Sequence, residues 1–206
     1  MNAPAEPPPP MEWNSFMRRP VTYIDLRRLA GCFDDAFGAE LCGRLRDASR
    51  LHDRLSALIS ERYALASPVA AEAVDETDRS IALLPVAQLD DLIRRAGAIY
   101  WANAIAAVVL AKDVGRLHEQ LGEAICAAAL ANRDLSGPAD TFESLDGVDA
   151  RVTQDGERCL AAWCRSQPES VGARVRLKFA PGRAIDDPPE NTIAEIGPSI
   201  VRGAMG

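Results

Sequence analysis

Residues 83–130 constrain the fold of this 206-residue chain more than any other segment. They read LLPVAQLDDLIRRAGAIYWANAIAAVVLAKDVGRLHEQLGEAICAAAL. Leu89, Leu92 and Ile93 recur at helical spacing, after a proline that a helix tolerates in its first turn. Gly97 is placed to end or bend this first helix.

The middle of the segment, residues 98–111, contains Asn103 but no charged side chain. A transmembrane helix needs about 20 apolar residues. This shorter run therefore predicts a buried central helix. Asp113 can cap a further helix, whose apolar face includes Leu121 and which a Ser-Gly-Pro sequence ends.

Two more helices are predicted outside this segment. Apolar residues recur at helical spacing from Phe37 to Ile59, which indicates one long amphipathic helix. Residues 148–164 indicate another, with Val152, Leu160 and Trp163 facing inward and Asp155, Glu157 and Arg158 facing outward. Alanine and leucine supply most of the apolar side chains, and both favour helix. The sequence therefore predicts an all-α or mostly α fold, built as a single compact multi-helix domain.

Apolar and basic residues alternate from Val171 to Phe179. A period of two is typical of a strand, so this stretch predicts a short extended C-terminal arm. Its basic side, formed by Arg174, Arg176 and Lys178, is the one local basic patch of the sequence. Two interpretations stay open: a solvated strand face, or a surface that binds an acidic partner.

The polar face of the first helix is the second candidate for partner binding. Asp90, Asp91, Arg94 and Arg95 lie outside its apolar stripe. We expect these four side chains to face solvent, where they are available to another protein.

Three parts are expected along the chain. Residues 1–20 contain APAEPPPP, which favours polyproline II and predicts a disordered Pro-rich leader. Residues 21–180 are predicted to form the helical domain. Residues 181–206 are rich in proline and glycine, which predicts a C-terminal tail with at most one short helix.

The net charge limits which classes of partner are expected, and the cysteines indicate the cellular compartment. With a net charge of −7, the chain repels phosphate backbones and anionic lipids, so neither a nucleic-acid partner nor adsorption to anionic lipid is expected. No direct membrane span is expected either, because the apolar run of residues 98–111 is too short. The N-terminus lacks the basic and apolar regions of a signal peptide. We expect a cytoplasmic protein with reduced, buried thiols at Cys32, Cys42, Cys126, Cys159 and Cys164.

No pattern of catalytic, cofactor-binding or metal-ligating residues is recognisable. Cys159 and Cys164 lack the second Cys or His pair that a zinc site needs. His52 and His118 lie on separate predicted helices, outside the local signatures of Cys–His nucleophile pairs. The phosphate-binding glycine loops are also missing from the sequence. We therefore expect no catalytic residue, no cofactor and no metal, and a protein that acts through contacts.

The segment 83–130 resembles the SctK family of type III secretion accessory proteins, which includes YscK, OrgA and MxiK. The resemblance rests on the LLP start, the helix up to Gly97, the apolar run after it and the VGRLHEQLGEAICAAAL stretch. The RVRLKF stretch before Pro181 fits more weakly. Within the family, the chain is most similar to the Hrp-type branch of plant-associated bacteria.

This resemblance implies a non-enzymatic cytoplasmic adaptor, peripheral to the inner-membrane secretion apparatus. Such an adaptor links the cytoplasmic domain of the inner-membrane ring protein to the pod protein of the sorting platform, and so supports effector secretion and virulence. Two other hypotheses stay open. One is a helical chaperone or regulatory module that binds another protein of a secretion system. The other is an enzyme with a Cys–His site outside the known signatures.

Overall fold

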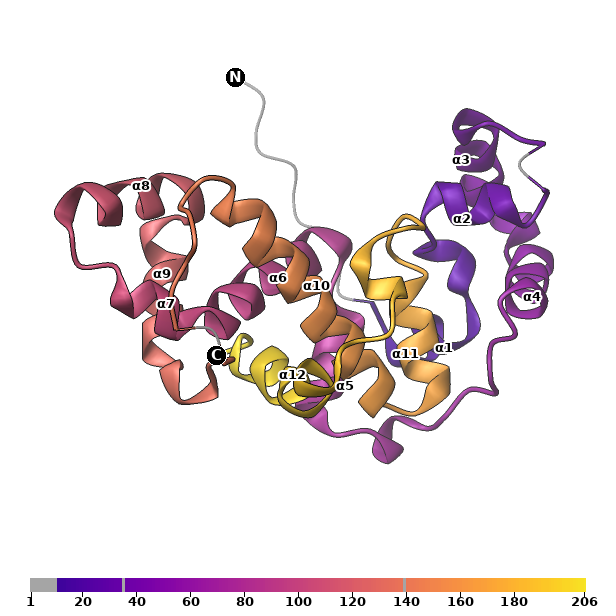
Figure 1. Cartoon of the computed structure of the whole chain (residues 1–206). Helices are drawn as coiled ribbons and strands as arrows, with labels where there is room; N and C mark the ends of the chain where they lie inside the picture. Colours follow the sequence, from indigo (N-terminus) through magenta and orange to yellow (C-terminus); the bar gives the residue numbers. More distant parts are fainter. Residues whose placement is uncertain (1–10, 35, 139) are drawn as a thin grey trace, which may run out of the picture.

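Helices α6 (Val86–Tyr100) and α10 (Val148–Ser166) cross at the centre of the molecule (Figure 1). Gly97 of α6 meets Gly156 of α10 at the crossing. A Cβ atom on Gly97 would overlap the carbonyl oxygen of Val152, and one on Gly156 would overlap a carbonyl oxygen of α6. The two backbones are therefore in direct contact.

The structure, a computed structural model, describes residues 11–34, 36–138 and 140–206, and no strand forms within them. The remaining α-helices are α1 (Trp13–Arg18), α2 (Leu26–Gly31), α3 (Ala39–Asp47), α4 (His52–Arg62), α5 (Glu76–Leu83), α7 (Ala102–Ala107), α8 (Ala111–Leu121), α9 (Glu123–Ala131), α11 (Glu169–Arg176) and α12 (Asn191–Gly203). The prediction of an all-α fold is confirmed.

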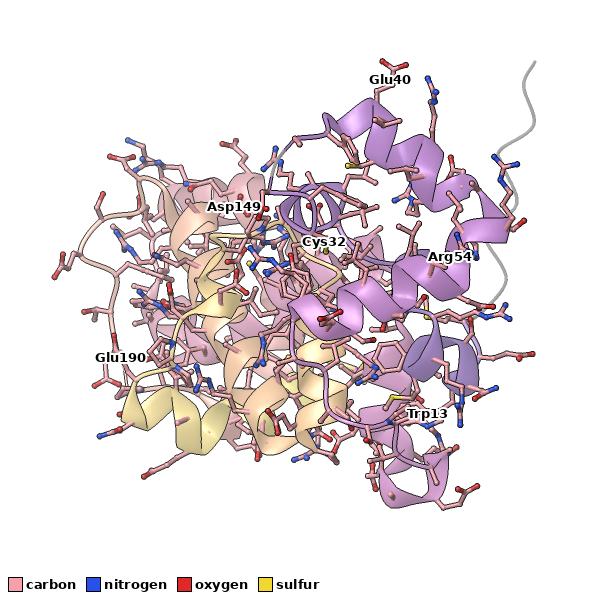
Figure 2. All side chains as sticks on the ribbon, turned by 90° about the vertical axis from the view of Figure 1, so that its right-hand side faces the viewer. Trp13, Cys32, Glu40, Arg54, Asp149 and Glu190 are labelled. Atoms are coloured by element: carbon pink, nitrogen blue, oxygen red, sulfur yellow. The ribbon has the colours of Figure 1, made fainter. Side chains whose placement is uncertain are left out.

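The molecule has two ends, and α6, α10, α11 and α1 lie between them. Helices α2, α3 and α4 lie at one end, and α7, α8 and α9 lie at the other (Figure 1). Figure 2 views the first end from outside, where Glu40 of α3 and Arg54 of α4 are exposed. The second end has a small core of its own, formed by Ala98, Ala102, Ile105, Leu117, Leu121, Cys126, Ala129, Val148 and Val152.

Several predicted helices have different boundaries in the structure. Residues 37–59 form α3 and the larger part of α4, separated by residues 48–51, instead of one long helix. Gly122 has a φ of 90°, which a helix cannot accommodate, so the predicted helix after Asp113 is divided into α8 and α9. Gly97 does not end the first helix but lies inside α6. A glycine is needed at this position because α10 leaves no space for a Cβ atom.

The prediction of one buried helix over residues 98–111 is wrong. Helix α6 extends to Tyr100, and α7 takes only residues 102–107. Val109 and Leu110 follow in the connection to α8 and are exposed. In the described part of the chain, no helix has both the length and the apolar character needed to cross a membrane.

Helix α10 is confirmed, with Val152, Leu160 and Trp163 buried as predicted. The prediction that Asp155 and Glu157 face outward is wrong, since both are buried. Donors from other segments satisfy these carboxylates, which makes burial tolerable. The face of α10 that contacts other elements is therefore wider than its apolar stripe.

The extended arm predicted over residues 171–179 is also wrong, because most of this stretch lies in helix α11. Positions 171, 174, 175 and 178 are spaced so that they share one face of a helix, and all four residues are buried. Two of them are Arg174 and Lys178. Because buried cations occupy half of this face, the hydrophobic pattern alternates although the backbone is helical.

The terminal segments pack more extensively than predicted. Residues 1–10 of the predicted leader lie outside the described residues, whereas residues 13–18 form α1, in which Phe16 and Met17 are buried. At the other end, α12 is 13 residues long and packs against α10, although at most one short helix was expected there. The reason is that α1 and α12 carry apolar side chains that pack into the main hydrophobic core.

We predict that Gly97→Ala lowers the free energy of unfolding by about 3 kcal/mol or more, because the added methyl group forces α6 and α10 apart. Gly115→Ala is the matched control. Gly115 lies inside α8 with open space beside it, so alanine there should stabilise the protein by up to about 1 kcal/mol. Urea unfolding followed by circular dichroism measures both changes. Equal midpoints for Gly97→Ala and the wild type would contradict the prediction.

Candidate interaction surface

We call Arg174, Arg176 and Lys178 the basic row. Its first member, Arg174, is not a surface charge, because it forms hydrogen bonds inside the molecule. Its side chain is buried, and its Nε donates to the carbonyl oxygen of Met17 at 2.9 Å. Its Nη1 donates to the carbonyl oxygens of Ala66, at 3.1 Å, and Ser170, at 2.8 Å. These bonds connect α11 to the end of α1 and to the segment after α4.

Lys178 is a second buried cation of the same face. Its Nζ donates to the carbonyl oxygens of Ala82 and Leu84, both at 2.7 Å. The same atom lies 5.2 Å from the ring centre of Phe16 and 5.6 Å from that of Tyr23. Burial lowers the pKa of Lys178 to about 7, since carbonyl oxygens and ring faces replace water only in part.

The basic row therefore does not form one surface. Of its three members, only Arg176 is partly exposed. It lines a shallow depression together with Glu169 and Asp186, so acidic groups accompany it. The three cations therefore do not form a surface patch on α11 that could face an acidic partner.

The four predicted residues of α6 are divided between internal contacts and solvent. Asp90 accepts from Arg183 at 2.9 Å, and Arg94 donates to Asp149 at the same distance. Asp91 is exposed, and Arg95 is partly exposed. Hence α6 uses Asp90 and Arg94 to hold neighbouring segments.

The cysteines do not favour nucleophilic chemistry. Burial raises the pKa values of Cys159 and Cys164 to about 12, so both remain thiols at neutral pH. Burial also raises the pKa values of Cys32 and Cys126. Within the described ranges, no three potential ligands gather in a way that could hold a metal ion.

An apolar groove at the α7–α9 end is the candidate site that emerges from the structure. We call it the VVL groove after the Val108–Val109–Leu110 loop on its rim. Val109 is 81% exposed and Leu110 is 65% exposed, the two highest values among the large apolar side chains that the structure describes. The groove is lined by Ala104, Ala107, Val108, Val109, Leu110, Asp113, Thr141, Phe142 and Leu145.

The far wall of the groove is held in place from the centre of the molecule. The Phe142 ring stacks on the Trp101 ring, with centres 5.0 Å apart and planes 18° apart. Trp101 Nε1 donates to the carboxylate of Asp155 at 2.8 Å, and Arg158 donates to the same carboxylate at 2.9 Å. The wall is therefore anchored on α10, which suits a surface formed before a partner binds.

The α7–α9 end is acidic. Residues 104–149 contain eight acidic and three basic side chains, whereas the whole chain contains 30 and 23. Asp113 lines the groove, and Glu143 is exposed beside Phe142 in the sequence. The groove is thus lined mostly by apolar side chains, at an end of the molecule with more acidic than basic residues, although Lys112 is exposed next to Asp113 and Arg151 lies over the Trp101 ring.

Sequence reasoning missed this site because it assigned Val109 and Leu110 to a buried helix. One signal was present: the connection before Lys112–Asp113 consists entirely of apolar residues, whereas loops that face water are usually polar. Recognising it required knowing that α7 ends at residue 107.

We predict that the stability of the wild type rises with pH above about 7 more steeply than that of Lys178→Met. In the unfolded chain a lysine titrates near pH 10.4, whereas folding lowers the pKa of Lys178 to about 7. Between these values the unfolded state binds more protons, so raising the pH stabilises the folded state.

The measurement is urea unfolding of both proteins at pH 7.0 and pH 8.5. The wild type should gain about 1 to 2 kcal/mol more than the variant over this interval. The buried thiols contribute equally to both proteins and cancel in the difference. Equal pH dependence of the two proteins would show that Lys178 does not titrate in this range.

Comparisons with known proteins place the chain in a family. The family model described as "YOP proteins translocation protein K (YscK)" matches residues 12–201. The nodulation proteins NolU of Rhizobium fredii and of Sinorhizobium fredii are each 30% identical to this chain over 110 residues, which cover 50% of this chain and 49% of the relative. The chain thus spans about half the length of the curated relatives it matches. No solved structure matches the chain. Because the family model covers nearly all of the sequence, this chain belongs to the YscK family of type III secretion proteins.

Proposed function

We propose that this chain is a non-catalytic adaptor of the sorting platform of a type III secretion system. In this role it links the cytoplasmic domain of the inner-membrane ring protein to the pod protein, and so supports effector secretion. The observation that carries the proposal is the family match over residues 12–201. The adaptor lies in the cytoplasm, peripheral to the inner-membrane apparatus.

The structure supports a role in binding for two reasons. The two ends of the molecule are connected through packed helices: α6 and α10 cross in close backbone contact, α11 packs against α10, and α1 packs against α11. The buried polar groups described above are occupied with holding helices together, and the cysteines with raised pKa values are poor nucleophiles. A molecule with two ends held by packed helices suits a protein that connects two others.

We also propose that the apparatus is one of a plant-associated bacterium, in the Hrp-type branch. The similarity to two nodulation proteins of rhizobia supports this choice. The identity of the neighbouring genes tests it: genes for other Hrp-type components beside this one support the branch, and genes of another secretion branch contradict it.

We predict that a tagged copy of this chain retains both the ring protein and the pod protein when it is purified from cells that express the whole system. A clean deletion should abolish effector secretion, and a plasmid with the wild-type gene should restore it. Immunoblots of culture supernatants measure secretion. Normal secretion in the deletion strain would exclude the adaptor function.

A further inference from the structure

The VVL groove has features that folding alone does not explain. Val109 and Leu110 lie in a connection of three apolar residues and expose most of their side chains to water. Burying such a side chain is favourable, and the isolated chain does not gain this stabilisation. A partner that covers the loop would gain it.

Leu110 also occupies a position where folding favours another residue type. It is the N-cap of α8, and no side chain caps that helix terminus. Serine, threonine, aspartate and asparagine are preferred at N-caps because their oxygen atoms accept hydrogen bonds from the first free N–H groups of the helix. Leucine at this position thus lowers helix stability and at the same time exposes apolar surface.

The charges around the groove restrict what can bind there. Its end of the molecule has the excess of acidic side chains described above, and Asp113 lies in the lining itself. A second copy of this chain that docked end to end would bring the same excess of acidic side chains, and an anionic lipid surface would also be repelled. A segment that carries apolar side chains and Lys or Arg residues is attracted on both counts.

We propose that the VVL groove binds an amphipathic, basic segment of another protein of the secretion apparatus, whose apolar side chains cover Val109 and Leu110 and whose Lys or Arg residues face Asp113 and Glu143. The proposal rests on the proposed adaptor function for the source of the segment. The groove itself and the chemistry of its occupant rest on the exposed loop, the N-cap leucine and the acidic surroundings.

The first test uses the full chain and a defined probe. The probe is a fluorescein-labelled helical peptide with leucines on one face and lysines on the other, and its control has glutamate in place of every lysine. Fluorescence anisotropy measures binding. The wild-type chain should bind the lysine peptide at least about tenfold more tightly than the glutamate peptide.

Variants locate the binding. The double variant Val109→Ser, Leu110→Ser should weaken binding of the lysine peptide about tenfold, because the apolar contact is lost without a change in charge. The matched control is Val86→Ser, Leu130→Ser, which alters the two other exposed large apolar side chains of the described chain, neither of which lines the groove. Equal binding by both double variants would overturn the proposal.

Stability provides an independent readout. Leu110→Ser supplies a capping side chain to α8, so the melting temperature should stay the same or rise while binding falls. Opposite signs for stability and binding separate a docking role from a structural one. A lower melting temperature together with weaker binding would show that Leu110 supports the fold instead.

The second test separates this proposal from the adaptor function. Purified pod protein and purified cytoplasmic domain of the ring protein are titrated against the wild type and against Val109→Ser, Leu110→Ser. If a partner binds both chains equally well, the groove proposal fails and the adaptor function stands. If neither partner binds the wild type whereas the lysine peptide does, the adaptor function fails and the groove stands.

Discussion

The contact between the backbones of α6 and α10 is the constraint on which the rest of the structure depends. It exists because Gly97 and Gly156 face each other without side chains, so the two helices approach as closely as main chains allow. Both hydrophobic clusters include residues of these two helices. Helices α11 and α12 approach α10 in the same way, at Gly172 and Gly197. One central helix, contacted closely by three others, thus organises a chain in which no strand forms within the described ranges.

Buried polar groups complete the connections that a sheet would otherwise make between distant segments. Asp78 of α5 accepts hydrogen bonds from Trp163, Gln167 and Arg202, which belong to α10, the following turn and α12. Burial raises the pKa of Asp78, but the hydrogen bonds from these donors outweigh burial and hold that pKa below its usual range. Such ties make the chain cooperative, since losing one partner leaves a buried charge unsatisfied.

This arrangement decides where a partner can bind. Arg174 and Lys178 are buried and bonded to backbone carbonyl oxygens, whereas Asp90 and Arg94 form ion pairs within the chain and stay partly exposed. The loop of residues 108–110 at the acidic end has the most exposed large apolar side chains that the structure describes. In this member of the YscK family, that loop lines the VVL groove together with Phe142 and Leu145.

The sequence by itself determined the helical class, the position of α10, the apolar stripe of α6 and the family resemblance, because hydrophobic periodicity within one segment reports which side of that segment is apolar. It could not show that Gly97 is a crossing point, that Arg174 and Lys178 are buried, or that Val109 and Leu110 are exposed. The first two depend on groups that are distant in sequence, namely the carbonyl oxygen of Val152 and those of Met17 and Ala82. The third depends on where α7 ends, which the continuous apolar run does not mark. Only the tertiary structure brings those groups together, because packing, and not local pattern, decides whether a polar or an apolar side chain finds a partner.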